Sequence, residues 1–160
     1  MSVLGELQPN KVFKYFEEIC SIPHGSRNLQ QISDYLVDFA KAHELKYRQD
    51  EDLNVIIWKD GSKGYEASEP VILQGHMDMV AVKEADCDKD MEKEGLDLEI
   101  NGDYISAKGT SLGGDDGIAV AYTLAVLDDE EMAHPPIEAI FTVNEEIGML
   151  GAATIDVSDL

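Results

Sequence analysis

Basic residues are scarce in this sequence, and that shortage excludes several kinds of partner. Lys and Arg together number 12 against 33 Asp and Glu, so the formal net charge is −21 at pH 7. Nucleic acids and anionic membranes carry charge of the same sign, and we expect neither as a partner. Long apolar runs are also missing: none approaches the roughly 20 residues of a membrane-spanning helix.

Cysteine is scarce as well. The chain has two cysteines, Cys20 and Cys87, and they form no C-x-x-C pair. Two distant thiols favour a reducing compartment over a secreted, disulfide-held scaffold. The first residues lack a basic segment followed by an apolar core, so we expect no signal peptide. These shortages together predict a cytoplasmic protein.

What the chain does contain is enough apolar sequence for one domain, since 44% of its 160 residues are hydrophobic. Helical periodicity, β-branched runs and an Asn101-Gly102 turn predict its elements. The predicted helices cover residues 9–20, 28–43 and 117–127, the strands cover 46–49, 54–59, 71–73 and 137–143, and a hairpin joins 98–100 to 104–106. Residues 71–73 are expected to be a buried strand, and residues 148–153 a turn into a further helix.

Two polar residues, His76 and Asp78, follow the strand at 71–73. A histidine after a buried strand lies where open α/β sheets place their ligands. In His-x-Asp, the carboxylate can approach one ring nitrogen and leave the other free for a metal. The alternative is a loop histidine beside an unrelated acid. His24, in the turn after the first helix, is more often structural in such a position and stays outside the predicted site.

A second polar cluster lies in the glycine-rich loop at residues 109–117. Such a loop before a helix suggests phosphate binding, but no Lys follows Gly114, and Asp115 and Asp116 would repel an anion. Two adjacent carboxylates suit a cation, and the positive end of the following helix would help to keep them ionised. The alternative for Asp116 is that it only caps this helix.

A third cluster, Glu145 and Glu146, follows the strand at 137–143. Neighbouring residues in an extended chain point in different directions, so one acid can bind metal while the other handles a proton. In a sheet of parallel strands the three clusters lie at one edge. An imidazole with several carboxylates suits zinc, with manganese or cobalt as alternatives. Asp115 could bridge two ions about 3.5–4 Å apart. The competing interpretation is three unrelated solvated acidic turns.

These motifs resemble those of the zinc-dependent M20 metallopeptidases. The similar segments are Gly75-His-Met-Asp78, Gly113-Gly-Asp-Asp-Gly117 and Thr142-Val-Asn-Glu-Glu-Ile-Gly148. Longer similarities at residues 19–24, 73–80, 107–113 and 124–127 narrow the resemblance to the aminoacyl-histidine dipeptidase branch. The resemblance extends over essentially all 160 residues.

The resemblance implies a three-layer α/β/α catalytic domain with a mixed sheet and two zinc ions. His76 would bind one ion, Asp115 would bridge both, and Glu146 would bind the other. Asp78 would orient His76. Glu145 would be the general base that takes a proton from a metal-bridging water.

The resemblance also implies a cis peptide between Asp115 and Asp116, and further zinc ligands and a lid domain that would lie beyond Leu160. We therefore expect residues 1–160 to be the N-terminal part of the catalytic domain, truncated at its C-terminus. Because each zinc would then have only two protein ligands, the chain alone should bind zinc poorly and be inactive. Without an ion, the loops of the site should be displaced.

The activity implied for the whole enzyme is hydrolysis of the peptide bond of dipeptides, especially Xaa-His, with a homodimer formed through the lid domain. A related aminopeptidase or an N-acyl amino acid deacylase is the nearest alternative. A non-catalytic acidic binding module is the alternative from another class.

Overall fold

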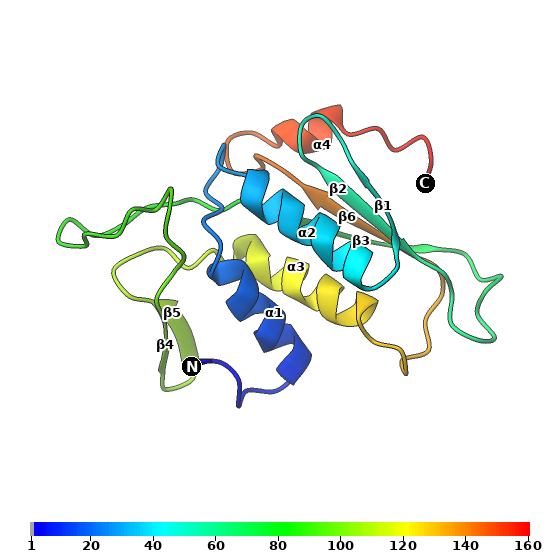
Figure 1. The fold of residues 1–160 in the computed structure, drawn as a ribbon, viewed down its shortest axis with the longest axis horizontal. Coiled ribbons are helices and arrows are strands. Elements are labelled where there is room, and N and C mark those ends of the chain that lie inside the picture. The colour runs from blue at the N-terminus through cyan, green and yellow to red at the C-terminus, as the bar shows by residue number, and fades with distance from the viewer. Residues whose placement is uncertain (1) are drawn as a thin grey trace.

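The fold is a four-stranded mixed sheet with three helices along one side (Figure 1). The structure, a computed structural model, describes residues 2–160. The helices are α1 Asn10–Cys20, α2 Gln30–Ala42, α3 Gly114–Leu127 and α4 Leu150–Thr154. The strands are β1 Lys46–Gln49, β2 Val55–Lys59, β3 Val71–His76, β4 Leu98–Asn101, β5 Tyr104–Ala107 and β6 Ile137–Thr142. No helix within the described residues is both long and apolar enough to cross a membrane.

The order of strands in the main sheet is β1-β2-β6-β3, and only the β3–β6 pair is parallel. Its register runs from Val71 opposite Ile137 to His76 opposite Thr142. Parallel strands end at the same edge of a sheet, so the loops that follow His76 and Thr142 leave the sheet side by side. This pairing is what brings two of the predicted polar clusters together.

The core lies between the sheet and the helices. Val55, Ile57 and Phe141 point from the central strands into this layer and are completely buried. Leu36 of α2 and Leu124 of α3 meet them from the helix side and are equally buried. Helix α3 packs between α1 and β3, which explains why it is apolar on nearly every face.

On the other side of the sheet, Figure 1 shows α4 and the segment that follows it. Arg48 of β1 points to this side, where its guanidinium donates to the Asp159 carboxylate at 2.9 Å and to the carbonyl oxygen of Asp156. Within residues 2–160, α4 is the only helix on that side, so the second helical layer of the expected three-layer α/β/α fold is short here. The α/β class and the mixed sheet are confirmed.

Most of the predicted elements are confirmed, with shifts of up to three residues at their ends. The hairpin is confirmed, but its turn is Gly102-Asp103 and not Asn101-Gly102, because Asn101 still pairs with Tyr104; Gly102 has the positive φ, 62°, that favours glycine. The expectation that the strand at 71–73 is buried is wrong: Val71 and Ile72 are 45% and 53% exposed. The reason is position, because β3 lies at the edge of the sheet and pairs only with β6 among the described strands.

Candidate metal centre

The site forms where the end of β3 meets the start of α3. His76 is the last residue of β3 and is 6% exposed. Gly75 before it allows α3 to approach closely, because a Cβ there would lie 3.0 Å from Asp116 Oδ2 and 3.4 Å from Ala119 Cβ. Asp115 and Asp116 have non-helical φ and ψ, so the regular helix starts after them, as the sequence predicted.

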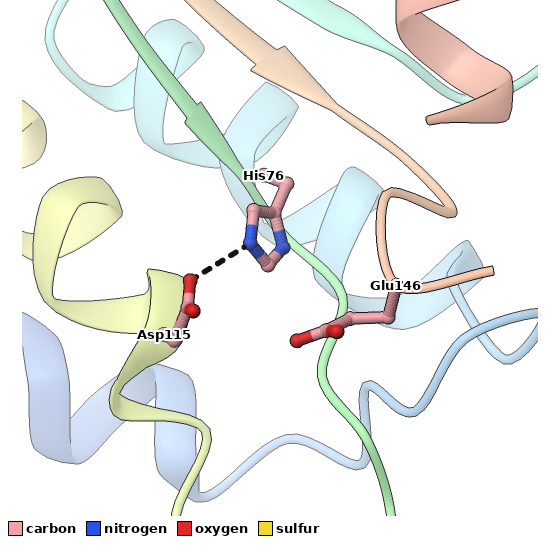
Figure 2. Close-up of side chains that lie close together, drawn as sticks. All are labelled: His76, Asp115 and Glu146. Carbon is pink, nitrogen blue, oxygen red and sulfur yellow. Dashed lines mark hydrogen bonds and ion pairs between the residues drawn. The ribbon is translucent and has the colours of Figure 1, made fainter. Parts of the chain in front are cut away.

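The three predicted metal ligands come together. One ligand atom each from His76, Asp115 and Glu146 lies within 4.8 Å of the others. Figure 2 shows Asp115 approaching the imidazole from the start of α3 and Glu146 from the loop after β6. The shortest contact joins His76 Nε2 to Asp115 Oδ1 at 3.1 Å. The structure therefore shows the three loops assembled around one point, while their mobility or displacement in the metal-free chain stays a prediction.

The hydrogen bonds of His76 fit a metal ligand. Its Nδ1 lies 2.9 Å from the carbonyl oxygen of Asp78, which can only accept, so Nδ1 carries a hydrogen. The lone pair for a metal is then on Nε2, the nitrogen that faces Asp115. Burial alone would lower the pKa of His76, but the hydrogen bond to Asp115 and the neighbouring Asp78 outweigh it and raise the pKa.

The carboxylate of Asp78 does something other than what was expected. It lies 3.6 Å from His76 Nδ1, so the ring is held by the main-chain carbonyl of Asp78 instead of its side chain. The carboxylate is completely buried and accepts hydrogen bonds from the amides of Glu145, at 2.9 Å, and Glu146, at 3.4 Å. The hydroxyl of Ser26 is its third donor, at 2.7 Å. Asp78 thus orients His76 through its backbone and the glutamate loop through its side chain.

The two glutamates occupy different positions. Glu146 belongs to the three-residue ligand cluster. Glu145 Oε2 lies 3.8 Å from His76 Nε2, and its side chain is 37% exposed. A carboxylate at the mouth of the site, reachable by water and adjacent to the ligands, suits proton transfer. The division of base and ligand between them stays a prediction.

Asp116 is turned away from the ligand cluster. Its Oδ2 accepts from the amide of His76 at 3.3 Å, and it also receives the amide of Ala119. Burial raises the pKa of Asp116, against the effect of these hydrogen bonds. Its contacts match the capping alternative and tie α3 to β3. The peptide between Asp115 and Asp116 is cis, which confirms the expectation from the resemblance.

The segment 24–28 was missed as part of the site. His24 is 3% exposed, and its Nδ1 lies 2.6 Å from the carbonyl oxygen of Ile22. Its Nε2 would lie 3.4 Å from a Cβ at Gly113, so the imidazole packs against the loop that precedes Asp115. Burial lowers the pKa of His24, which keeps it neutral. Ser26 contacts Asp78 directly. The sequence feature that could have indicated this segment was the family similarity at residues 19–24, which ended two residues before Ser26.

Comparison with known proteins gives close relatives. The chain is 41% identical over 152 residues to the cytosol non-specific dipeptidase of Escherichia coli, covering 95% of this chain and 31% of that protein. The crystal structure of an aminoacylhistidine dipeptidase from Vibrio alginolyticus superposes with a TM-score of 0.95 and 39% identity, over 98% of this chain and 32% of that one. A tripeptidase from Staphylococcus aureus shares the fold, with a TM-score of 0.77 at 24% identity over 98% of this chain and 42% of that one.

No protein-family model matches the chain. The chain spans about a third of the length of the two closely related dipeptidases, 31% and 32%. The two matches cover 95% and 98% of this chain. Over almost its whole length, therefore, this chain is a close homologue of dipeptidases of the M20 peptidase type.

Proposed function

We propose that this chain is part of a cytoplasmic, metal-dependent peptidase that hydrolyses the peptide bond of dipeptides. The observation that carries the proposal is the convergence of His76, Asp115 and Glu146 from three separate elements, with Glu145 beside them. It is supported by the 41% identity to a cytosol dipeptidase. An acidic binding module has no need of a second glutamate held next to the ligand by a buried carboxylate.

The donor set favours zinc. His76 Nε2 would hold one ion, a carboxylate oxygen of Glu146 would hold the other, and Asp115 would contribute to both. Zinc supplies Lewis acidity toward the peptide carbonyl and lowers the pKa of water. Manganese and cobalt accept the same donors.

The chain's own residues would carry the proton. Glu145 takes a proton from the attacking water and passes it to the amine that leaves. The amide hydrogen bond from Glu145 to Asp78, 2.9 Å long, fixes the backbone from which this carboxylate extends. Because its Nδ1 hydrogen is donated to the carbonyl oxygen of Asp78, His76 would offer the lone pair of Nε2 to an ion as a neutral imidazole.

The complete ligand shell would need further residues. With Asp115 shared between two ions, the three residues give each ion only two protein ligands. Zinc sites typically have three or four. We propose that residues 1–160 form the N-terminal part of the catalytic domain in a longer protein. The remaining ligands would come from its later part, and a lid domain would form a homodimer.

Among dipeptides, those with a carboxyl-terminal histidine are the first candidates, because a related structure is an aminoacylhistidine dipeptidase. A related aminopeptidase or an N-acyl amino acid deacylase is the alternative. Turnover of Xaa-His dipeptides, tripeptides and acyl amino acids by the full-length protein would separate the three.

The test of the site exchanges the two glutamates one at a time in the full-length protein. Glu145→Gln keeps the shape of the side chain but cannot accept a proton, so turnover should fall about 10²–10⁴-fold with metal content unchanged. Glu146→Gln should instead lower the metal content. Glu69→Gln removes the same charge from an exposed loop and is the matched control, with neither effect. The reverse pattern would show that base and ligand are exchanged.

A further inference from the structure

The segment 24–28 runs alongside the continuation of β3. The amide of Met79 donates to the carbonyl of His24 at 3.1 Å, and the amide of Ser26 donates to the carbonyl of Met79 at 3.1 Å. These two bonds form a parallel bridge between Gly25 and Met79. The segment is therefore fixed by its backbone, and the side chain of Ser26 has a defined position next to Asp78.

Two further bonds tie this segment to the glutamate loop. Ser26 Oγ donates to Asp78 Oδ2 at 2.7 Å, and the same carboxylate receives the amides of Glu145 and Glu146. The amide of Arg27 donates to Asn144 Oδ1 at 2.8 Å. Both Arg27 and Asn144 have positive φ, 72° and 53°, an uncommon conformation that holds these donors and acceptors in place.

We propose that Ser26 is a positioning residue for the glutamate loop: its hydroxyl holds the Asp78 carboxylate in the orientation that receives the amides of Glu145 and Glu146. This inference rests on the proposed function. It adds Ser26 to the site and assigns the Asp78 side chain to the base and ligand loop instead of to the imidazole.

Without the Ser26 hydroxyl, the Asp78 carboxylate loses the shortest of its three hydrogen bonds. Asp78 Oδ2 would keep only the long contact to the Glu146 amide, 3.4 Å. A buried carboxylate with an unfilled acceptor turns toward another donor, and His76 Nδ1 already lies 3.6 Å from its other oxygen, Oδ1. Ser26 also borders a cavity of about 910 Å³, so water can enter from there. Either change loosens the backbone that carries Glu145 and Glu146.

The experiment compares three variants of the full-length protein. Ser26→Ala removes the hydroxyl, and Ser26→Thr keeps it. Ser33→Ala is the matched control, since Ser33 Oγ makes a hydrogen bond of the same length, 2.7 Å, to the carbonyl of Leu53 in another part of the fold. The readouts are zinc affinity by chelator competition, which needs no turnover, and kcat and KM on a Xaa-His dipeptide.

Ser26→Ala should weaken zinc binding and lower kcat, each by about 10- to 100-fold, with KM nearly unchanged. Ser26→Thr should restore both, and Ser33→Ala should change only the thermal midpoint. Wild-type zinc affinity in Ser26→Ala, an equal loss of affinity in Ser33→Ala, or no rescue by Ser26→Thr would each overturn the proposal. If no peptide or acyl amino acid is turned over but zinc affinity follows this pattern, the proposed function fails while the positioning role stands.

Discussion

Replacing Asn54 with Ala should destabilise the end of β6 from which the glutamate loop extends. Asn54 is 1% exposed and lies between three segments. Its Oδ1 accepts the amide of Val143 at 3.1 Å. Its Nδ2 donates to Asp50 Oδ2 at 2.8 Å and to the carbonyl oxygen of Gly151 at 3.4 Å. Alanine removes all three bonds, while the Asn54 amide keeps its bond to Asp50 Oδ1.

The magnitude follows from the groups left without partners. Val143 is 1% exposed, so its amide has no water to replace Asn54, and an unpaired buried donor costs about 1–3 kcal/mol. The bond to the carboxylate of Asp50 contributes less than a buried charged bond, because Asp50 is partly exposed. The free energy of unfolding should fall by about 3 kcal/mol in all, which lowers Tm by about 6–12 °C in a chain of this length.

Urea unfolding followed by circular dichroism measures this loss in the metal-free chain. The midpoint should fall with an unchanged slope, because the surface exposed on unfolding is the same. Asn10→Ala is the control: it loses one exposed bond, 2.7 Å long, to the carbonyl of Gly5 and should change stability by less than about 0.5 kcal/mol. A loss below about 1 kcal/mol for Asn54→Ala would refute the reasoning that the Val143 amide has no other partner.

Three further predictions concern the metal-free chain. Isothermal titration calorimetry of residues 1–160 with zinc should show no pair of tight sites, and an activity assay should show no dipeptide hydrolysis, because His76 and two carboxylates give an incomplete ligand shell. Two tight sites together with turnover would contradict this. His76 has a raised pKa, so its contribution to stability is present below about pH 6.5 and is lost as pH rises through the raised value. The difference in unfolding free energy between wild type and His76→Gln in a chelator should therefore be larger at about pH 5 than at about pH 8, and an equal difference would show that the pKa is not raised. Burial raises the pKa of Cys20 to about 12, so iodoacetamide should modify the partly exposed Cys87 and reach Cys20 only on unfolding; equal rates, read by mass spectrometry, would rule this out.

The clustering of the three candidate metal ligands could be predicted from the sequence, because each follows a recognisable break. His76 ends an apolar run, Asp115 follows a glycine loop, and Glu146 comes just after a second apolar run. Parallel pairing of β3 with β6 then brings two of these positions to one edge of the sheet. This prediction required only the positions of the strand ends, which polar residues mark. It required no knowledge of side-chain contacts.

The role of the Asp78 carboxylate could not be predicted in the same way. The spacing from His76 allows contact with the imidazole, and nothing in the spacing reveals that two amides from residues 145 and 146 are nearer. That choice depends on the register between β3 and β6, whose paired residues, such as Val71 and Ile137, lie far apart in the sequence. The prediction that Val71 is buried failed for a related reason. An apolar run predicts a strand, but the position of that strand in the sheet decides whether its side chains are buried.

The outer edge of β3 determines how the isolated chain should be handled. Among the described strands this edge has no neighbour, and Val71 and Ile72 on β3 are largely exposed. Open edges with apolar side chains recruit strands from other copies and begin aggregation. The net charge of −21 keeps copies apart, but only over the Debye length, about 10 Å at 0.1 M salt and about 3 Å at 1 M. Dilute buffer therefore protects the chain from self-association, and concentrated salt removes that protection.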